Sequence, residues 1–251
     1  MDNEVLQNVV IKNHDLKNLL TSWSDYVMQH KEMINTCIYK RQLHHVDKDS
    51  VVANQDDMRE IDYYVSEEYL NLVKEKEALH LGFPEVCIGW ALNPKGPGHS
   101  MKWTDDKPTT EMLEWRDQHI ERYSNFNQEM MMCLGTRHNA LCQLYPPNEG
   151  IIGWHNNANA SAYNLIFTYS ETGDGYWQHL NPKTDTIETI EDIPGWQCKA
   201  SYFGSYGEYN PNTLIYHAAK TRNSHRLTVS YIFERTNKDY WLDAIEEIEF
   251  G

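Results

Sequence analysis

The stretch Asn139–Asn157, NALCQLYPPNEGIIGWHNN, decides the fold that we expect for this chain. Its first seven residues favour a strand, a Pro-Pro-Asn-Glu-Gly turn follows, and a second apolar strand ends on His155. Successive side chains of a strand point to opposite faces, so His155 and Asn157 share one face. By the same rule Gln143 and Tyr145 share a face of the preceding strand.

A second stretch, Leu214–Phe233 with the sequence LIYHAAKTRNSHRLTVSYIF, supplies the other half of the pattern. Its last strand alternates strictly. Arg226, Thr228 and Ser230 share a polar face, and the opposite face is apolar. We predict that the apolar face packs against helices or a second sheet, and that the polar face lines a cavity. His217 precedes this strand, so we interpret the two stretches as halves of one pocket.

The order of the elements predicts an α+β fold. Helical patterns come first, over residues 1–45, around 63–73 and over 109–131, with a short apolar piece at 86–92. Short strands with turns between them follow, which is typical of a sandwich or barrel. The expected strands are 139–145, 151–156, 161–169, 175–180, 186–190, 198–204, 212–217 and 226–234. The final segment, 236–251, is acidic and predicted to be helical.

Composition narrows the class of protein. The 251 residues, 40% of them hydrophobic, suit one large domain or a domain with an elaboration, and no apolar run has the length of a membrane span. The net charge of −15 argues against nucleic-acid polymers and anionic lipid surfaces as partners. Five cysteines without a C-x-x-C pair favour free thiols in the cytoplasm, and the acidic start does not have the pattern of a signal peptide.

The polar residues of the two stretches suit a metal site beside an anion site. A histidine and a carboxylate two residues apart on a strand, with a distant second histidine, are the ligands of non-haem Fe(II) oxygenases. Here His155 and His217 are the histidines, and Asn157 stands where the carboxylate is expected. The guanidinium of Arg226 suits a bidentate grip on the carboxylate of a 2-oxoacid.

Residues 135–235 resemble the 2-oxoglutarate/Fe(II)-dependent dioxygenases, and within that superfamily the AlkB-type branch. The resemblance rests on N-x-L-C-x-L-Y, then N-E and W-H, followed by His217 and Arg226. It implies a double-stranded β-helix (jelly-roll) core over 136–235, a mainly helical elaboration over 1–135 and a C-terminal segment over 236–251.

The resemblance also implies roles for single residues. His155 and His217 would bind iron, with Asn157 at the position of the third ligand. Arg226, beside Thr228 or Ser230, would pair with the far carboxylate of 2-oxoglutarate. Hydrogen bonds to the same co-substrate would come from Tyr145 and Gln143.

Two departures from the family pattern are visible. Asn157 replaces the carboxylate ligand, and Ile232 stands where the AlkB-type branch has a second arginine. The amide oxygen of Asn157 could bind the metal, or Asp174, Glu171 or His179 could reach in from the neighbouring hairpin. The position could also be left to water or chloride, as in halogenating members, or the site could hold no metal.

The sequence therefore predicts an oxygenase that hydroxylates or oxidatively demethylates a small molecule, a nucleotide or a peptide. The alternatives are a catalytically impaired protein that binds a metal or a 2-oxoacid on the same fold, and a halogenase-like variant. Demethylation of a nucleic-acid polymer is disfavoured by the acidic charge and by Ile232.

Overall fold

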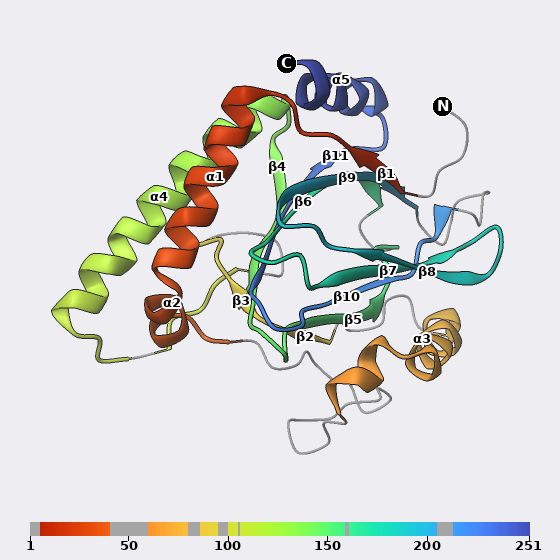
Figure 1. The fold of residues 1–251 in the computed structure, drawn as a ribbon, viewed down its shortest axis with the longest axis horizontal. Helices are drawn as coiled ribbons and strands as arrows, with labels where there is room; N and C mark the ends of the chain where they lie inside the picture. Colours follow the sequence, from red (N-terminus) through yellow and green to blue (C-terminus); the bar gives the residue numbers. More distant parts are fainter. Residues whose placement is uncertain are drawn as a thin grey trace.

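Two antiparallel sheets face each other at the centre of the molecule (Figure 1). The computed structural model describes residues 6–40, 60–79, 86–94, 100–104, 106–158, 161–204 and 213–251. One sheet has the strand order β1-β9-β6-β11-β4-β3, and the other has the order β2-β5-β10-β7-β8. The first contains β1 (Gln7–Val9), β3 (Trp90–Ala91), β4 (His138–Tyr145), β6 (Ala162–Ser170), β9 (Gly195–Phe203) and β11 (Arg226–Phe233). The second contains β2 (Cys87–Ile88), β5 (Ile151–His155), β7 (Tyr176–Asn181), β8 (Thr186–Glu191) and β10 (His217–Lys220).

Strands β4 to β11 supply the central strands of both sheets. The chain crosses from one sheet to the other after β4, β5, β6, β8, β9 and β10, so strands distant in sequence become neighbours. This order agrees with the jelly-roll core expected from the sequence. Strands β1, β2 and β3 come from the first 135 residues and extend the sheets by pairing with β9, β5 and β4. A division of the chain at residue 135 stays a prediction.

Helices cover the outer faces of both sheets (Figure 1). Against the larger sheet lie α1 (His14–Gln29), α2 (Lys31–Cys37), α4 (Thr110–Leu134) and α5 (Lys238–Phe250). The 3-10 helix η2 (Ile61–Val65) and α3 (Glu67–Leu79) lie against the smaller sheet. The caps follow from the sequence, since the side chains of Asn13 and Thr109 accept hydrogen bonds from the backbone at the starts of α1 and α4. Gly135 ends α4 with a φ of 65°.

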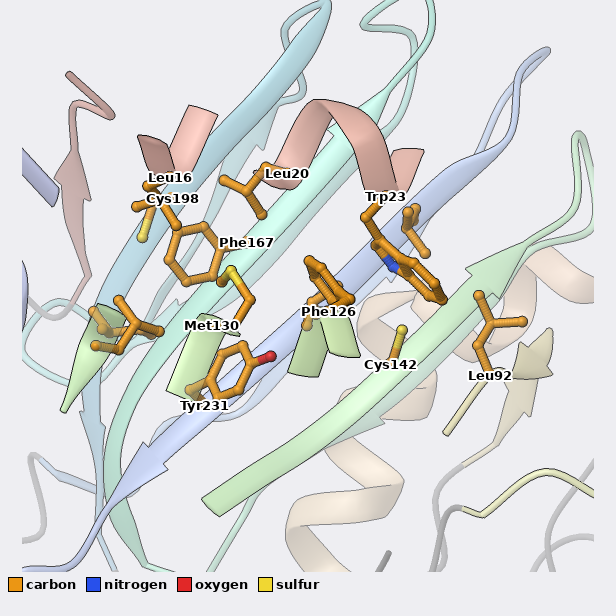
Figure 2. Packing of buried hydrophobic residues seen from close by; sticks show 14 of the residues in the cluster. Leu16, Leu20, Trp23, Leu92, Phe126, Met130, Cys142, Phe167, Cys198 and Tyr231 are labelled. Carbon is orange, nitrogen blue, oxygen red and sulfur yellow. The ribbon is translucent and has the colours of Figure 1, made fainter. Parts of the chain in front are cut away.

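The larger hydrophobic core lies between the helices and the outer face of the six-stranded sheet. Figure 2 shows side chains of α1 and α4 meeting those of the strands, with Trp23 beside Phe126 and Met130 beside Phe167. The Trp23 and Phe126 rings stack at 4.6 Å between centroids. The apolar face predicted for residues 226–233 lies here, because Leu227, Val229, Tyr231 and Phe233 all belong to this cluster.

Seven of the eight predicted strands are confirmed to within three residues at each end. The prediction at 212–217 is wrong over 213–216, because β10 runs from His217 to Lys220, and residue 212 lies outside the described residues. Ile215 and Tyr216 lie outside any described strand. Their apolar side chains, which suggested a strand, pack into two different cores. The small residues Ala218 and Ala219 form the strand in their place.

The long N-terminal helix predicted over 1–45 is also corrected. Strand β1 precedes the helical part, which is broken at His30 into α1 and α2. The parts of that prediction at 1–5 and 41–45 lie outside the described residues. Among the residues that the structure describes, no helix combines the length and the apolar character needed to cross a membrane.

Candidate functional site

Two histidines predicted as metal ligands lie side by side between the sheets. Strands β5 and β10 pair so that His155 stands directly opposite His217. Directly opposed residues of antiparallel strands point to the same face, so the two imidazoles share one surface. Their ring centroids are 4.1 Å apart. The side chains are almost fully buried, with 2% and 4% of their residues' surface exposed.

Hydrogen bonds to the backbone fix the orientation of both rings. The Nδ1 of His155 donates to the carbonyl of Gly153 at 2.8 Å, and the Nδ1 of His217 donates to that of Ile215 at 3.1 Å. A carbonyl only accepts, so each Nδ1 carries the hydrogen and each Nε2 of a neutral ring carries the lone pair. This is the outer hydrogen bond that metal-binding histidines make in proteins.

The surroundings of His217 keep its ring neutral. Trp177 of β7 and Phe203 of β9 stack on it, with centroids at 4.8 Å and 4.7 Å. Burial lowers the pKa of His217 well below its usual value, and the neighbouring His155 lowers it further. A neutral imidazole is the form that binds a metal ion. Phe203 belongs to the opposite sheet, so the histidine pair lies in the interior between the two sheets.

The third ligand position has no carboxylate among the described residues. Asn157 lies two residues beyond the end of β5 and is half-buried. Asp174 is engaged elsewhere, since it accepts hydrogen bonds from the backbone of Asn223 and from the hydroxyl of Ser224. Glu171 is exposed and lies 3.9 Å from His225.

His179 is the alternative residue that lies in the same row as the pair. It stands directly opposite His217 across β7 and β10, and Glu188 of β8 stands opposite His179 in turn. Its Nε2 lies 3.1 Å from Glu188, whereas its Nδ1 is buried and has no hydrogen-bond partner within the described structure. Burial lowers the pKa of His179, although Glu188 acts in the opposite direction.

In the described part of the chain, no three His, Cys, Asp or Glu side chains are grouped closely enough to hold a metal ion. The residues therefore fit Fe(II) in part. Two imidazoles whose Nδ1 atoms are held by backbone carbonyls suit it, and the remaining candidate donors are the amide of Asn157 and the imidazole of His179.

Arg226 marks the second part of the site, at the other end of β10. The chain turns after Lys220 and re-enters the opposite sheet at Arg226, so His217 is about 10 Å along the strand from that turn. The guanidinium is buried, with 3% of the residue exposed. Its Nη1 donates to Thr228 at 2.9 Å and its Nη2 to Thr168 at 3.4 Å. The polar face predicted for this strand thus faces the interior.

The guanidinium also has a protein carboxylate, which the sequence analysis missed. The Nε of Arg226 donates to Asp192 at 2.8 Å, and both side chains are buried. Asp192 comes directly after β8, where neither spacing nor motif distinguishes it from its acidic neighbours. Gly175 makes room for this pair, because a Cβ there would lie 2.5 Å from the Asp192 carboxylate.

The remaining predicted residues line the same interior. Tyr145 and Gln143 of β4 stand opposite Arg226 and Thr228 of β11. All four are at least 95% buried. The side chain of Gln143 donates to the Sγ of Cys87. The structure therefore brings Arg226, Thr228, Tyr145 and Gln143 together on one sheet, facing the sheet that carries the histidines.

Lys199 is a second buried cation that the sequence analysis missed. It has no exposed surface, and its Nζ donates to Gln197 at 3.0 Å. A signal was present, since polar Gln197, Lys199 and Ser201 alternate with apolar Cys198 and Ala200. Burial lowers the pKa of Lys199 to about 8, and Arg226 acts in the same direction.

Comparisons with known proteins give distant structural similarities. No family model matches the chain, and no curated protein matches its sequence. Among solved structures, a Pseudomonas putida prolyl-4-hydroxylase is similar over 93% of this chain and 94% of its own, with 9% identity and a TM-score of 0.37. OsALKBH1 is similar over 93% of this chain and its whole length, with 9% identity and a TM-score of 0.38.

A third similar structure is an oxidoreductase of the 2OG-Fe(II) oxygenase family from Burkholderia pseudomallei. It matches 69% of this chain and 81% of its own, with 14% identity and a TM-score of 0.28. Since all three TM-scores lie below 0.5, the case for a function rests on the geometry of the site.

Proposed function

We propose that this protein is an Fe(II)- and 2-oxoglutarate-dependent oxygenase. The observation that carries the proposal is the pairing of His155 and His217 between the sheets, with each Nδ1 fixed by a backbone carbonyl. The two Nε2 atoms would hold the metal. When bound, Fe(II) would supply the redox chemistry that couples decarboxylation of a 2-oxoacid to oxidation of a C–H bond by O₂.

The chain's own residues would position the co-substrate. Arg226 keeps two N–H groups beyond those given to Asp192, Thr228 and Thr168, enough for a bidentate grip on a carboxylate. Tyr145 and Gln143 lie on the neighbouring strand as further hydrogen-bonding groups. The stacked rings of Trp177 and Phe203 would exclude water beside His217, which strengthens polar interactions there.

An anaerobic titration tests this proposal. Fe(II) followed by 2-oxoglutarate is expected to produce a visible charge-transfer band, and admission of O₂ is expected to yield succinate. His217→Ala should abolish both signals. His138→Ala is the matched control, because His138 is an exposed histidine on a strand of the same core. Absence of both the band and succinate in the wild-type protein would refute the proposal.

The third ligand is tested by substitution of Asn157. We infer that the amide oxygen of Asn157 or a solvent molecule completes the metal site. His179 is the alternative protein donor. Asn157→Asp adds an anionic ligand and should tighten Fe(II) binding by about tenfold or more, or about 1.4 kcal/mol. An unchanged affinity would place Asn157 outside the metal site.

The same variant separates the proposal from a catalytically impaired protein. If Asn157→Asp forms succinate and the wild type binds 2-oxoglutarate without turnover, the chain is a binding protein on an oxygenase fold. Chloride-dependent turnover by the wild type would indicate a halogenase-like reaction. For the substrate we propose a small molecule, a nucleotide or a peptide, because the charge of −15 disfavours a nucleic-acid polymer.

A further inference from the structure

The buried charged groups between the two sheets include two cations, Arg226 and Lys199, beside one anion, Asp192. Arg226 and Asp192 neutralise each other through a direct hydrogen bond at 2.8 Å between buried groups. The second carboxylate oxygen of Asp192 accepts from Gln197 at 2.9 Å, so each oxygen of the anion has a protein donor. The neighbouring Lys199 adds a positive charge to this network. Among the described residues, Asp192 is the one carboxylate that acts on the pKa of Lys199, so two cations share one anion.

Lys199 is built into the interior rather than into the surface. It lies on the inner face of β9, opposite Ile166 of β6, and has no exposed surface. An ammonium group has three N–H donors, and the structure gives one hydrogen bond, to Gln197. Burial of a charged amine with unmet donors is costly, so such a group usually has an anionic partner.

The two ends of the interior between the sheets differ in charge. Lys199 reaches Gln197, Gln197 reaches Asp192, and Asp192 reaches Arg226, so both cations meet at one end of the interior. On the same face of β9, Phe203 lies four residues further along, about 13 Å in a strand, and stacks on His217. One end of the interior is therefore cationic, and the other end carries the imidazoles of His155 and His217.

We propose that Lys199 is the residue that selects a dicarboxylate co-substrate over a monocarboxylate one. This inference rests on the proposed function. It assigns the choice between dicarboxylate and monocarboxylate to the charge of Lys199 and not to that of Arg226. Arg226, compensated by Asp192, supplies directional hydrogen bonds, whereas Lys199 supplies the uncompensated charge that the distal carboxylate neutralises.

Calorimetric titration of the protein with 2-oxoglutarate and with 2-oxobutyrate, which lacks the distal carboxylate, tests the proposal. Mn(II) replaces Fe(II), so that no turnover occurs, and the titrations are repeated without metal. We expect the wild type to prefer 2-oxoglutarate by about tenfold or more, and Lys199→Met to lose that preference with unchanged Mn(II) affinity. Lys183→Met, at the exposed turn between β7 and β8, is the matched control and should retain the preference.

A double variant separates charge from shape. Lys199→Met with Asp192→Asn removes one cation and one anion, so it restores the net positive charge through Arg226. We expect the preference for 2-oxoglutarate to return in part. A preference that survives Lys199→Met, or that is lost as strongly in Lys183→Met, would overturn the proposal.

The outcomes distinguish this inference from the proposed function. Succinate formation by the wild type, with an unchanged preference in Lys199→Met, would support the oxygenase function and contradict the role of Lys199. A Lys199-dependent preference in a protein that binds no metal would support the anion site at Lys199 and contradict the oxygenase function. A wild type that binds neither acid, with or without metal, would overturn the role of Lys199.

Discussion

The two faces of the six-stranded sheet differ completely, although the same strands build both. On the outer face Phe167, Val229 and Tyr231 pack against the helices in one apolar cluster. On the inner face their sequence neighbours Thr168 and Thr228 contact Arg226. Alternation along each strand thus separates two tasks within a few ångströms. The outer face stabilises the fold. The inner face carries buried polar groups whose burial costs stability, and the proposed ligand would use them.

The largest expected effect compares two adjacent residues of β6. Phe167→Ala should lower the free energy of unfolding by about 3–5 kcal/mol, because it leaves a cavity in the outer core. Thr168→Val should cost about 1 kcal/mol, since it removes one acceptor from Arg226. Urea denaturation of both variants measures the difference. Equal losses would contradict the division of tasks between the faces.

Metal binding should stabilise the inner side of the molecule. Fe(II) at 100 times its dissociation constant, under anaerobic conditions, should raise the free energy of unfolding by about 2.7 kcal/mol in the wild type. No such increment is expected in His217→Ala, because it lacks one of the two proposed imidazole ligands. The measurement is the shift of the urea midpoint on addition of metal, with His138→Ala as the control. An increment that persists in His217→Ala would exclude the histidine pair as the metal site.

Lys199 should oppose stability rather than support it. Its pKa is about 8 in the folded protein against 10.5 for an unperturbed lysine, so the folded state binds fewer protons between these values. Wild-type stability should therefore rise from about pH 8 to pH 10.5, and the cost should be fully present below pH 8. The other titratable groups that act on Lys199 are Arg226, Asp192 and Cys198.

Lys199→Met should remove that rise and stabilise the protein at pH 7 by about 2 kcal/mol. Urea denaturation across pH 7 to 10.5 tests both expectations. A variant that is less stable than the wild type at pH 7 would show that Lys199 is structural, which would contradict its assignment to the ligand.

The smallest effect is expected at the surface. Arg222 pairs with Glu191 at 2.7 Å, but about half of each side chain is exposed. Arg222→Gln should therefore cost about 0.2–1 kcal/mol, and the cost should shrink as salt is added. A loss of unfolding free energy as large as that of Phe167→Ala would contradict a minor role for the ion pair between Arg222 and Glu191.

Much of the fold was predictable, because periodicity is a local signal. The alternation in residues 226–233 predicted both the strand and its two faces, and the helix predicted over 109–131 begins after its cap at Thr109. The strand at 217–220 was not predictable. Its alanines have no strand preference of their own, and they pair because β5 and β7 lie on either side.

The sequence by itself determined the order of the elements. It also predicted His155, His217 and Arg226 as site residues, because residue types and their alternation can be read directly from the chain. Only the tertiary structure decided that the two histidines stand opposite each other with their Nδ1 atoms fixed, that Asp192 pairs with Arg226, and that Lys199 is buried. These facts depend on strand register and on which charge lies next to which. Both are set by contacts between residues far apart in the sequence.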